Sequence, residues 1–148
     1  MLKKIILILV VLFFTGCSYN IKESSNSEVQ IKVKAIINNN EYIVNLEDNE
    51  TVNEFIKLLP LEFNMNELNG NEKYIYLNTN LPSNSLNIEK INKGDIMLFG
   101  NNCIVIFYES FNTTYQYTKI GHIDNLPNLG KDNILVRFEK KQWYDTIK

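Results

Sequence analysis

The chemistry open to this chain depends first on its single histidine, His122. It lies in the segment Ile120-Gly121-His122-Ile123, and Asp124 follows two positions after it. Residues two apart on a strand share a face, about 7 Å apart at Cα, so Asp124 has the spacing of a carboxylate that orients a histidine base. One histidine cannot by itself build a zinc site, which needs three or four His, Cys or carboxylate ligands. We therefore expect no metal, and we favour a polar position in a pocket or at the surface over catalysis for His122.

Cys103 and Asp95 carry groups that could react, but a structural role fits each residue better than a catalytic role. Cys103 begins the run Cys103-Ile104-Val105-Ile106-Phe107, which is typical of a buried strand. A nucleophilic cysteine needs a neighbouring base and an exposed thiolate, so we interpret Cys103 as a small buried hydrophobe. Asp95 follows Gly94 at the start of another predicted strand, where an aspartate more often fixes a turn through its side chain.

A concentration of aromatic residues in three predicted strands is the strongest indication of a binding site. Tyrosine combines a rigid ring with a hydrogen-bonding tip, so a tyrosine patch beside polar loop residues could receive a peptide or a glycan. The loop Ser110–Thr114 has the composition of a flexible gate for such a pocket. The alternative is that the aromatic side chains fill the interior of a barrel. The aromatic residues are Tyr74, Tyr76, Phe107, Tyr108, Phe111, Tyr115 and Tyr117, and the candidate ligand-binding residues are Tyr76, Asn78, Tyr108, Tyr115, Tyr117 and His122.

The other cysteine, Cys17, ends a segment with the features of an export signal. Lys3 and Lys4 precede an unbroken apolar run from Ile5 to Phe14, which is too short to span a bilayer comfortably. The following Phe14-Thr15-Gly16-Cys17 resembles the lipobox of bacterial lipoproteins, with Phe14 where leucine is usual. The alternatives are an uncleaved anchor and a cysteine that stands there by chance.

The lipobox resemblance implies a location and a membrane partner. Residues 1–16 would be a signal peptide, and Cys17 would carry the lipid. Residues 17–28 would be a polar tether, and the domain would be lipid-anchored at the bacterial cell envelope, outside the cytoplasm. We expect no cofactor, because nucleotides are not supplied there and the sequence contains no glycine-rich phosphate-binding motif.

Composition and charge are those of one globular domain. The chain has 148 residues, of which 45% are hydrophobic and 22% are charged. Its 15 basic and 17 acidic residues give a net charge of −2, which argues against a nucleic-acid partner because such proteins usually carry a basic excess. We place the domain at residues 29–141 and a C-terminal tail at residues 142–148.

Period-two alternation of apolar residues predicts a mainly β fold with one good helix. The helix is expected at residues 51–59, because Thr51 and Glu54 form a capping box and Pro60 follows. A short helical turn is expected at 126–129, and Asn38-Asn39-Asn40 should turn a hairpin. Many short strands at this spacing are typical of a small closed barrel of about eight strands. Strands are expected at residues 29–37, 42–46, 61–65, 74–77, 95–99, 103–109, 115–123 and 134–138.

Several separated motifs resemble the bacterial cyclophilin-like fold family. The resemblance runs from about Ile31 to Glu139 and implies a closed β-barrel of about eight strands with a capping helix, in agreement with the alternation pattern. The segments that carry it are Leu58–Leu61, Asn64–Tyr74, Gly94–Gly100, Ile106–Tyr108 and Tyr115–Gly121.

The name of that family suggests prolyl isomerisation, but the residues do not match the cyclophilin catalytic pattern. Cyclophilins carry an arginine in a Phe-His-Arg-like segment, supported by a Gln-Gly-Gly-Asp stretch, and this chain has neither; its only arginine is Arg137. A lysine is a poor substitute, because it presents a point charge instead of a planar fork. We therefore expect a ligand- or peptide-binding module rather than an enzyme. The alternatives are a divergent peptidyl-prolyl isomerase that acts on exported proteins and an interaction protein with no small ligand.

Overall fold

The computed structural model describes residues 31–142, which form eleven strands and one helix. The predicted signal peptide (1–16), the lipidation site Cys17, the tether (17–28) and residues 143–148 of the predicted tail lie outside the described residues. Within residues 31–142, no helix has the length and apolar character needed to cross a membrane. The elements are β1 (Ile31–Ile37), β2 (Asn40–Leu46), α1 (Glu50–Lys57), β3 (Leu61–Leu68), β4 (Glu72–Tyr76), β5 (Leu86–Asn87), β6 (Lys90–Ile91), β7 (Asp95–Phe99), β8 (Cys103–Phe107), β9 (Phe111–Asn112), β10 (Gln116–His122) and β11 (Ile134–Gln142).

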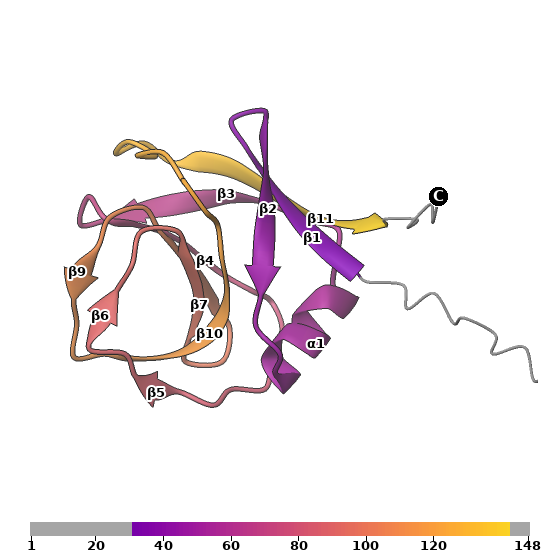
Figure 1. The fold of residues 1–148 in the computed structure, drawn as a ribbon, viewed down its shortest axis with the longest axis horizontal. Helices are drawn as coiled ribbons and strands as arrows, with labels where there is room; N and C mark the ends of the chain where they lie inside the picture. Colours follow the sequence, from indigo (N-terminus) through magenta and orange to yellow (C-terminus); the bar gives the residue numbers. More distant parts are fainter. Residues whose placement is uncertain (1–30, 143–148) are drawn as a thin grey trace, which may run out of the picture.

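Eight of these strands close into an antiparallel barrel (Figure 1). Their order is β2-β1-β11-β3-β4-β8-β7-β10, and pairing of β10 with β2 completes the ring. The short strand β5 adds to the free part of β10, while β6 and β9 form a separate two-stranded ribbon. The predicted mainly β, eight-stranded barrel is confirmed. The described segment closes its own barrel and fills it with its own side chains, so a chain of residues 18–148 contains every residue of this barrel.

The first hairpin follows directly from the asparagine run. Asn38 and Asn39 have φ values of +49° and +64°, and Ile37 pairs with Asn40 across the turn. Asparagine tolerates the left-handed conformation better than most residues with a side chain, and two successive positive φ values match the right-handed twist of a hairpin. The predicted turn is confirmed.

Helix α1 covers one end of the barrel, but its predicted capping box is wrong. The N-cap is Asn49, whose side-chain oxygen accepts a hydrogen bond from the Val52 amide at 2.9 Å. Thr51 lies inside the helix and donates its hydroxyl to the Pro82 carbonyl at 2.6 Å. Asparagine caps at least as well as threonine, and Asn49 Nδ2 also donates to the Lys119 carbonyl. A tertiary contact therefore helps to place the N-cap two residues earlier than the local pattern suggests.

The predicted helical turn at 126–129 is also absent. A turn at residues 124–125 precedes this stretch, which is irregular. Asn125 and Gly130 have positive φ values of +55° and +70°, and Leu126 is buried in the interior of the barrel. Tertiary contacts therefore hold the segment in place of a helical hydrogen-bond pattern.

Two hydrophobic clusters lie on opposite faces of β7 and β8. Ile104 and Ile106 point into the barrel interior, where Phe55 of α1 meets Phe138 of β11 at 5.5 Å between ring centroids. The alternate side chains of the same strands point outward and form a second cluster with Ile91 of β6 and Tyr117 of β10. The members from β7 and β8 are Met97, Cys103, Val105 and Phe107. An apolar face outside a barrel needs a cover, and β6 and β9 lie over part of it because Ile91 and Phe111 belong to this cluster. The part that remains open is the candidate site.

Candidate functional site

An open cleft of about 610 Å³ lies on the outer face of the barrel. Side chains from β4, β8 and β10 form its base, and the segment from Phe111 to Tyr115 forms one wall. The volume falls within the range of small-molecule and peptide-side-chain sites. The predicted gate, Ser110–Thr114, therefore contributes most of its residues to the cleft.

Strand alternation explains which side chains reach the cleft. On β4, Glu72, Tyr74 and Tyr76 point outward, whereas Lys73 is fully buried and points inward. Tyr74 lies opposite Val105 of β8, and Tyr76 lies opposite Cys103. Side chains directly opposite on paired strands are neighbours on one face, so the tyrosines of β4 stand beside the small floor residues of β8.

Aromatic rings surround this floor and contact one another edge to face or at a tilt. Phe99 lies 6.0 Å from Tyr115 and 5.6 Å from Tyr117, and Tyr117 lies 5.5 Å from Phe107. Such pairs add about 0.5–1.5 kcal/mol each beyond burial alone, so the ring positions are mutually fixed. Tyr76 and Tyr115 are 59% and 63% exposed, which leaves the rim accessible. The six aromatic lining residues are Tyr74, Tyr76, Phe99, Phe111, Tyr115 and Tyr117.

Glu72 is the one charged side chain that lines the cleft, among the residues described. Burial raises the pKa of its carboxyl, and the nearby Glu67 carboxylate raises it further. A half-buried carboxylate without a cationic neighbour has this shift because the charged form loses hydration. The cleft therefore combines an apolar, aromatic surface with a single acidic group.

The thiol and phenol groups of the floor remain protonated at neutral pH. Burial raises the pKa of Cys103 to about 11, and the Glu72 charge acts in the same direction. Burial likewise raises the pKa of Tyr117 to about 12. A thiolate is the nucleophilic form of cysteine, so Cys103 serves as an apolar floor residue, in line with its interpretation as a buried hydrophobe.

Three of the candidate residues taken from the sequence meet in the cleft, and three lie elsewhere. Tyr76, Tyr115 and Tyr117 line it. Tyr108 belongs to the interior cluster, where its hydroxyl donates to Glu67 Oε1 at 3.1 Å. Asn78 is exposed on the loop after β4 and does not line the cleft. Sequence reasoning missed Glu72 and Phe99, although Glu72 shares the alternation of Tyr74 and Tyr76 and could have been found from it.

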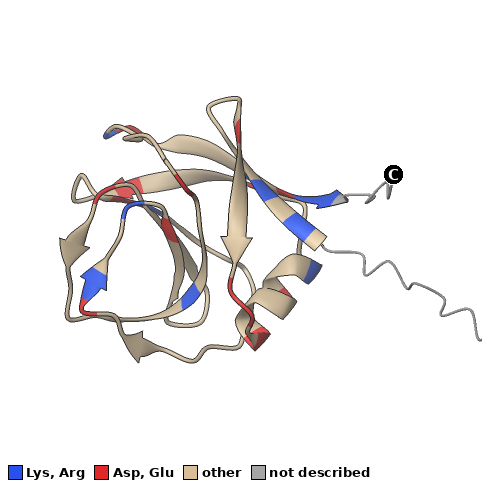
Figure 2. Cartoon of the chain, viewed as in Figure 1, with Lys and Arg blue, Asp and Glu red and all other residues tan. Residues whose placement is uncertain are grey.

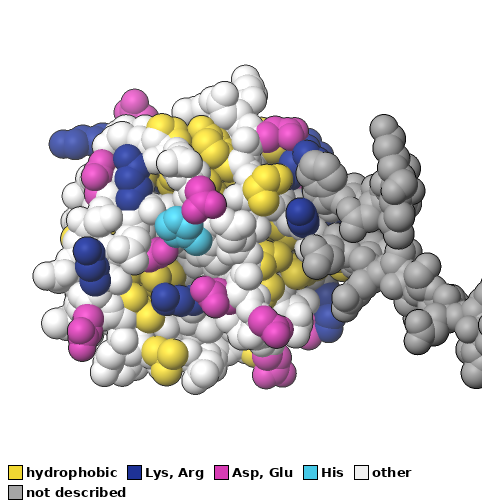
Figure 3. All heavy atoms as spheres, in the orientation of Figure 1, with side chains coloured by type: hydrophobic (Ala, Val, Ile, Leu, Met, Phe, Trp, Pro, Cys, Tyr) yellow, Lys and Arg dark blue, Asp and Glu magenta, His cyan; other side chains and the backbone are white. Residues whose placement is uncertain are grey.

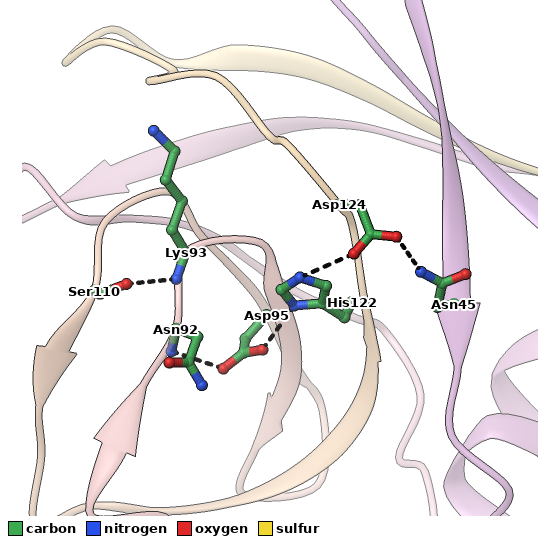
Figure 4. A network of polar contacts seen from close by, with 7 residues as sticks. All are labelled: Asn45, Asn92, Lys93, Asp95, Ser110, His122 and Asp124. Atoms are coloured by element: carbon green, nitrogen blue, oxygen red, sulfur yellow. Dashed lines mark hydrogen bonds and ion pairs between the residues drawn. The ribbon is translucent and has the colours of Figure 1, made fainter.

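His122 lies outside the cleft, in a polar network that joins three strands (Figure 4). Its Nδ1 is 2.9 Å from Asp95 Oδ1, and its Nε2 is 3.6 Å from Asp124 Oδ1. Asp124 Oδ2 in turn accepts a hydrogen bond from Asn45 Nδ2 at 2.8 Å. Figure 3 shows the histidine at the surface between acidic side chains.

Asp95 has the turn-fixing function expected from the sequence. Its Oδ2 accepts a hydrogen bond from the Asn92 amide at 2.8 Å, and the neighbouring Lys93 amide donates to Ser110 Oγ at 2.8 Å. The Asp95 side chain therefore holds the turn before β7 while its other oxygen meets His122. The Asp95 and Asp124 carboxylates and the His122 ring each have partners within the network, which is the pattern of a structural site.

The comparisons agree with the barrel. Neither the curated proteins nor the solved structures compared with the chain gave a significant match. A family model described as the cyclophilin-like family matches residues 35–139, a span that runs from β1 to β11 and contains every residue of the cleft. This chain therefore belongs to the cyclophilin-like family.

Proposed function

We propose that this chain is a ligand-binding module without cyclophilin catalysis, and that it holds a peptide or similar ligand in the aromatic cleft. The observation that carries this proposal is the open cleft of about 610 Å³ with six aromatic side chains on its walls. Rigid aromatic surfaces with polar tips are typical of ligand and peptide sites. The exposed Tyr76 and Tyr115 are the first contacts that an incoming ligand would make.

The position of the only arginine supports binding rather than isomerisation. Arg137 lies on β11, forms an ion pair with Glu139 and does not line the cleft. In the barrel order β11 is separated from β4 by β3. Prolyl isomerisation has a barrier of about 18–20 kcal/mol, and the cleft offers no guanidinium that could act on the amide nitrogen.

We also propose that a lipid on Cys17 holds the barrel at the bacterial cell envelope. The support is the order of charge, apolar run, small residues and cysteine at the start of the chain. Mass spectrometry of the N-terminal peptide from a bacterial membrane fraction tests this proposal. An acylated Cys17 would support it, and an intact Met1 terminus or an unmodified Cys17 would contradict it.

NMR of a ¹⁵N-labelled chain of residues 18–148 tests the binding function. Short X-Pro peptides and envelope glycan fragments are added in turn, and cis/trans exchange of each peptide is recorded. The expected result is a set of shifts confined to β4, β8, β10 and residues 111–115, with exchange unchanged. Accelerated exchange would establish the isomerase alternative, and the absence of cleft shifts with every ligand would contradict the proposed function.

A further inference from the structure

Among the residues described, Glu72 combines partial burial in the cleft with a carboxylate that has no partner. Among the described residues it makes no hydrogen bond and no ion pair. By contrast, Asp95 and Asp124 are both engaged in the network of Figure 4. A half-buried charge that lacks a partner destabilises the fold. Among the described residues, no basic side chain pairs with Glu72 to offset this cost.

The neighbouring lysine does not neutralise Glu72. Lys73 points to the opposite face of β4, where its ammonium donates to the Gly130 and Asp132 carbonyls at 2.7 Å each. No lysine or arginine is among the described residues that line the cleft. Basic and acidic residues are interspersed over the remaining ribbon (Figure 2). The cleft is therefore a locally negative, aromatic environment on a surface of mixed charge.

Aromatic faces attract cations through their quadrupole. A cation within about 6 Å of a ring centroid gains roughly 0.5–2 kcal/mol, more where it is desolvated. Tyr74 and Tyr76 stand on the same face of β4 as Glu72, with their rings 5.9 Å apart, and the Glu72 charge acts on Tyr117 across the floor. Rings and carboxylate would thus act on the same bound cation.

From these observations we infer that the cleft takes a primary ammonium group on an apolar stem, with the Glu72 carboxylate as the acceptor and the tyrosine rings around the stem. This inference rests on the proposed function of the cleft and names the chemistry that it selects. A primary ammonium has three N–H donors, whereas a quaternary ammonium has none and could use only the rings and the charge. A lysine side chain of a peptide supplies such a group on such a stem, and an ethanolamine headgroup is the competing outcome of the test.

The test compares end-capped peptides that differ only at one side chain. The probes are a lysine peptide, its trimethyl-lysine analogue and its norleucine analogue, and phosphoethanolamine is titrated separately. Dissociation constants come from NMR shifts of residues 18–148. We expect the lysine peptide to bind about tenfold more tightly than the norleucine peptide, with trimethyl-lysine between them. Tighter binding of phosphoethanolamine than of the lysine peptide would identify a headgroup as the source of the ammonium.

The Glu72→Gln variant removes the charge of the side chain and keeps its shape, so it tests the contribution of the charge to binding. This variant should reduce lysine-peptide affinity about tenfold and leave norleucine-peptide affinity within about twofold. The matched control is Glu62→Gln, because Glu62 is an exposed strand glutamate on β3 that does not line the cleft. Circular dichroism of both variants checks that the barrel is retained.

Three results would overturn the inference and still leave the binding function open to its own test. If norleucine and lysine peptides shift the cleft signals with equal affinity, the cleft binds ligands but does not select an ammonium. If Glu72→Gln and Glu62→Gln give the same lysine-peptide affinity, Glu72 is not the acceptor. Absence of cleft shifts with all four of these probes would also overturn the inference, and the X-Pro and glycan titrations would then decide the broader function.

Discussion

His122 Nδ1 lies 2.9 Å from Asp95 Oδ1, and this contact joins β10 to β7 next to an irregularity in their pairing. The register between the two strands shifts between Lys119 and Gly121. Gly94 lets the histidine ring approach, because a Cβ there would lie 2.9 Å from His122 Cε1 and 2.2 Å from the Ile123 carbonyl oxygen. The φ of Gly94, +99°, is also one that side-chain-bearing residues rarely adopt.

Removal of the Asp95 carboxylate should therefore destabilise the barrel. Asp95→Ala leaves the Asn92 amide and His122 Nδ1 without their acceptor, and we expect a loss of about 1–3 kcal/mol in the free energy of unfolding. Urea denaturation measures this loss. Asp124→Ala is the control, because Asp124 is 70% exposed and its removal should cost under about 1 kcal/mol. Equal losses for the two variants would show that Asp95 has no special structural role.

Lys73 is expected to stabilise the fold even though it is a buried charge. Its ammonium donates to two backbone carbonyls and lies 4.9 Å from the centre of the Tyr108 ring. Burial lowers its pKa, but Lys73→Met would leave both carbonyls without a donor and should cost about 2–4 kcal/mol. Urea denaturation of the variant checks this value. Lys131→Met, at an exposed position, is the control, and a Lys73→Met barrel as stable as this control would contradict the prediction.

The strands could be predicted from the sequence because their apolar residues alternate. The pattern at residues 29–37 and 42–46 anticipated β1 and β2 closely, since one face of each strand packs into the barrel interior. The apolar run from Cys103 predicted a central strand, and β8 is indeed covered on both faces by the two clusters. The helix start was misplaced because the contact of Asn49 with Lys119 is tertiary, and no local pattern contains it.

The cleft could be predicted only in part, because it depends on strand register. Tyr115 and Tyr117 share a face by alternation, but their contact with Phe99 depends on how residues 115–117 lie beside β7. Tyr108 belongs to the same concentration of aromatic residues in the sequence as the cleft tyrosines. It nevertheless points inward, because it follows Ile104 and Ile106 in the two-residue alternation of inward-facing side chains. The face to which each aromatic residue points, not the number of aromatic residues, defines the site.

The rim tyrosines should affect ligand binding and leave stability nearly unchanged. Tyr76 and Tyr115 are 59% and 63% exposed, so Tyr76→Ala and Tyr115→Ala should each change the free energy of unfolding by under about 1 kcal/mol. Each variant should weaken binding of any cleft ligand about fivefold or more, since rigid aromatic contacts dominate such sites. Isothermal titration with the tightest peptide measures the effect. Leu135→Ala, another exposed apolar residue, is the control, and equal affinity for all three variants would rule out a binding role for the rim.

Cys103 should react slowly with alkylating reagents in the folded chain. Burial raises its pKa to about 11, so near pH 8 the thiolate fraction is far lower than for a free cysteine, whose pKa is about 8.5. Mass spectrometry after iodoacetamide treatment of residues 18–148, with and without urea, compares the two states. We expect alkylation in urea to be faster by at least about tenfold. Rapid alkylation of the native chain would mean that the floor of the cleft is open to solvent and that Cys103 is a reactive thiol.

Glu72 should make the stability of the barrel fall as the pH rises through the acidic range. Its folded-state pKa lies above the ordinary value of 4.5, with burial as the main cause and the Glu67 charge as the second. The folded state thus holds the proton more tightly than the unfolded state, so the contribution of Glu72 to stability is greatest below pH 4.5 and declines until the pH exceeds the folded-state pKa. The groups that the Glu72 charge reaches across the cleft, Cys103 and Tyr117, titrate at about 11 and 12 and stay neutral over this range.

Glu72→Gln isolates this contribution, because it removes the titration and keeps the shape of the side chain. We expect the variant to be more stable than the parent chain at neutral pH and to lose this advantage below pH 4.5, where the parent Glu72 is protonated. Denaturation midpoints of both proteins across this range give the comparison, with Glu62→Gln as the matched exposed control. A stability difference that stays constant with pH would show that burial does not perturb Glu72. A less stable Glu72→Gln barrel at neutral pH would show that the carboxylate has a partner within the fold, which would remove the main argument for an external ammonium.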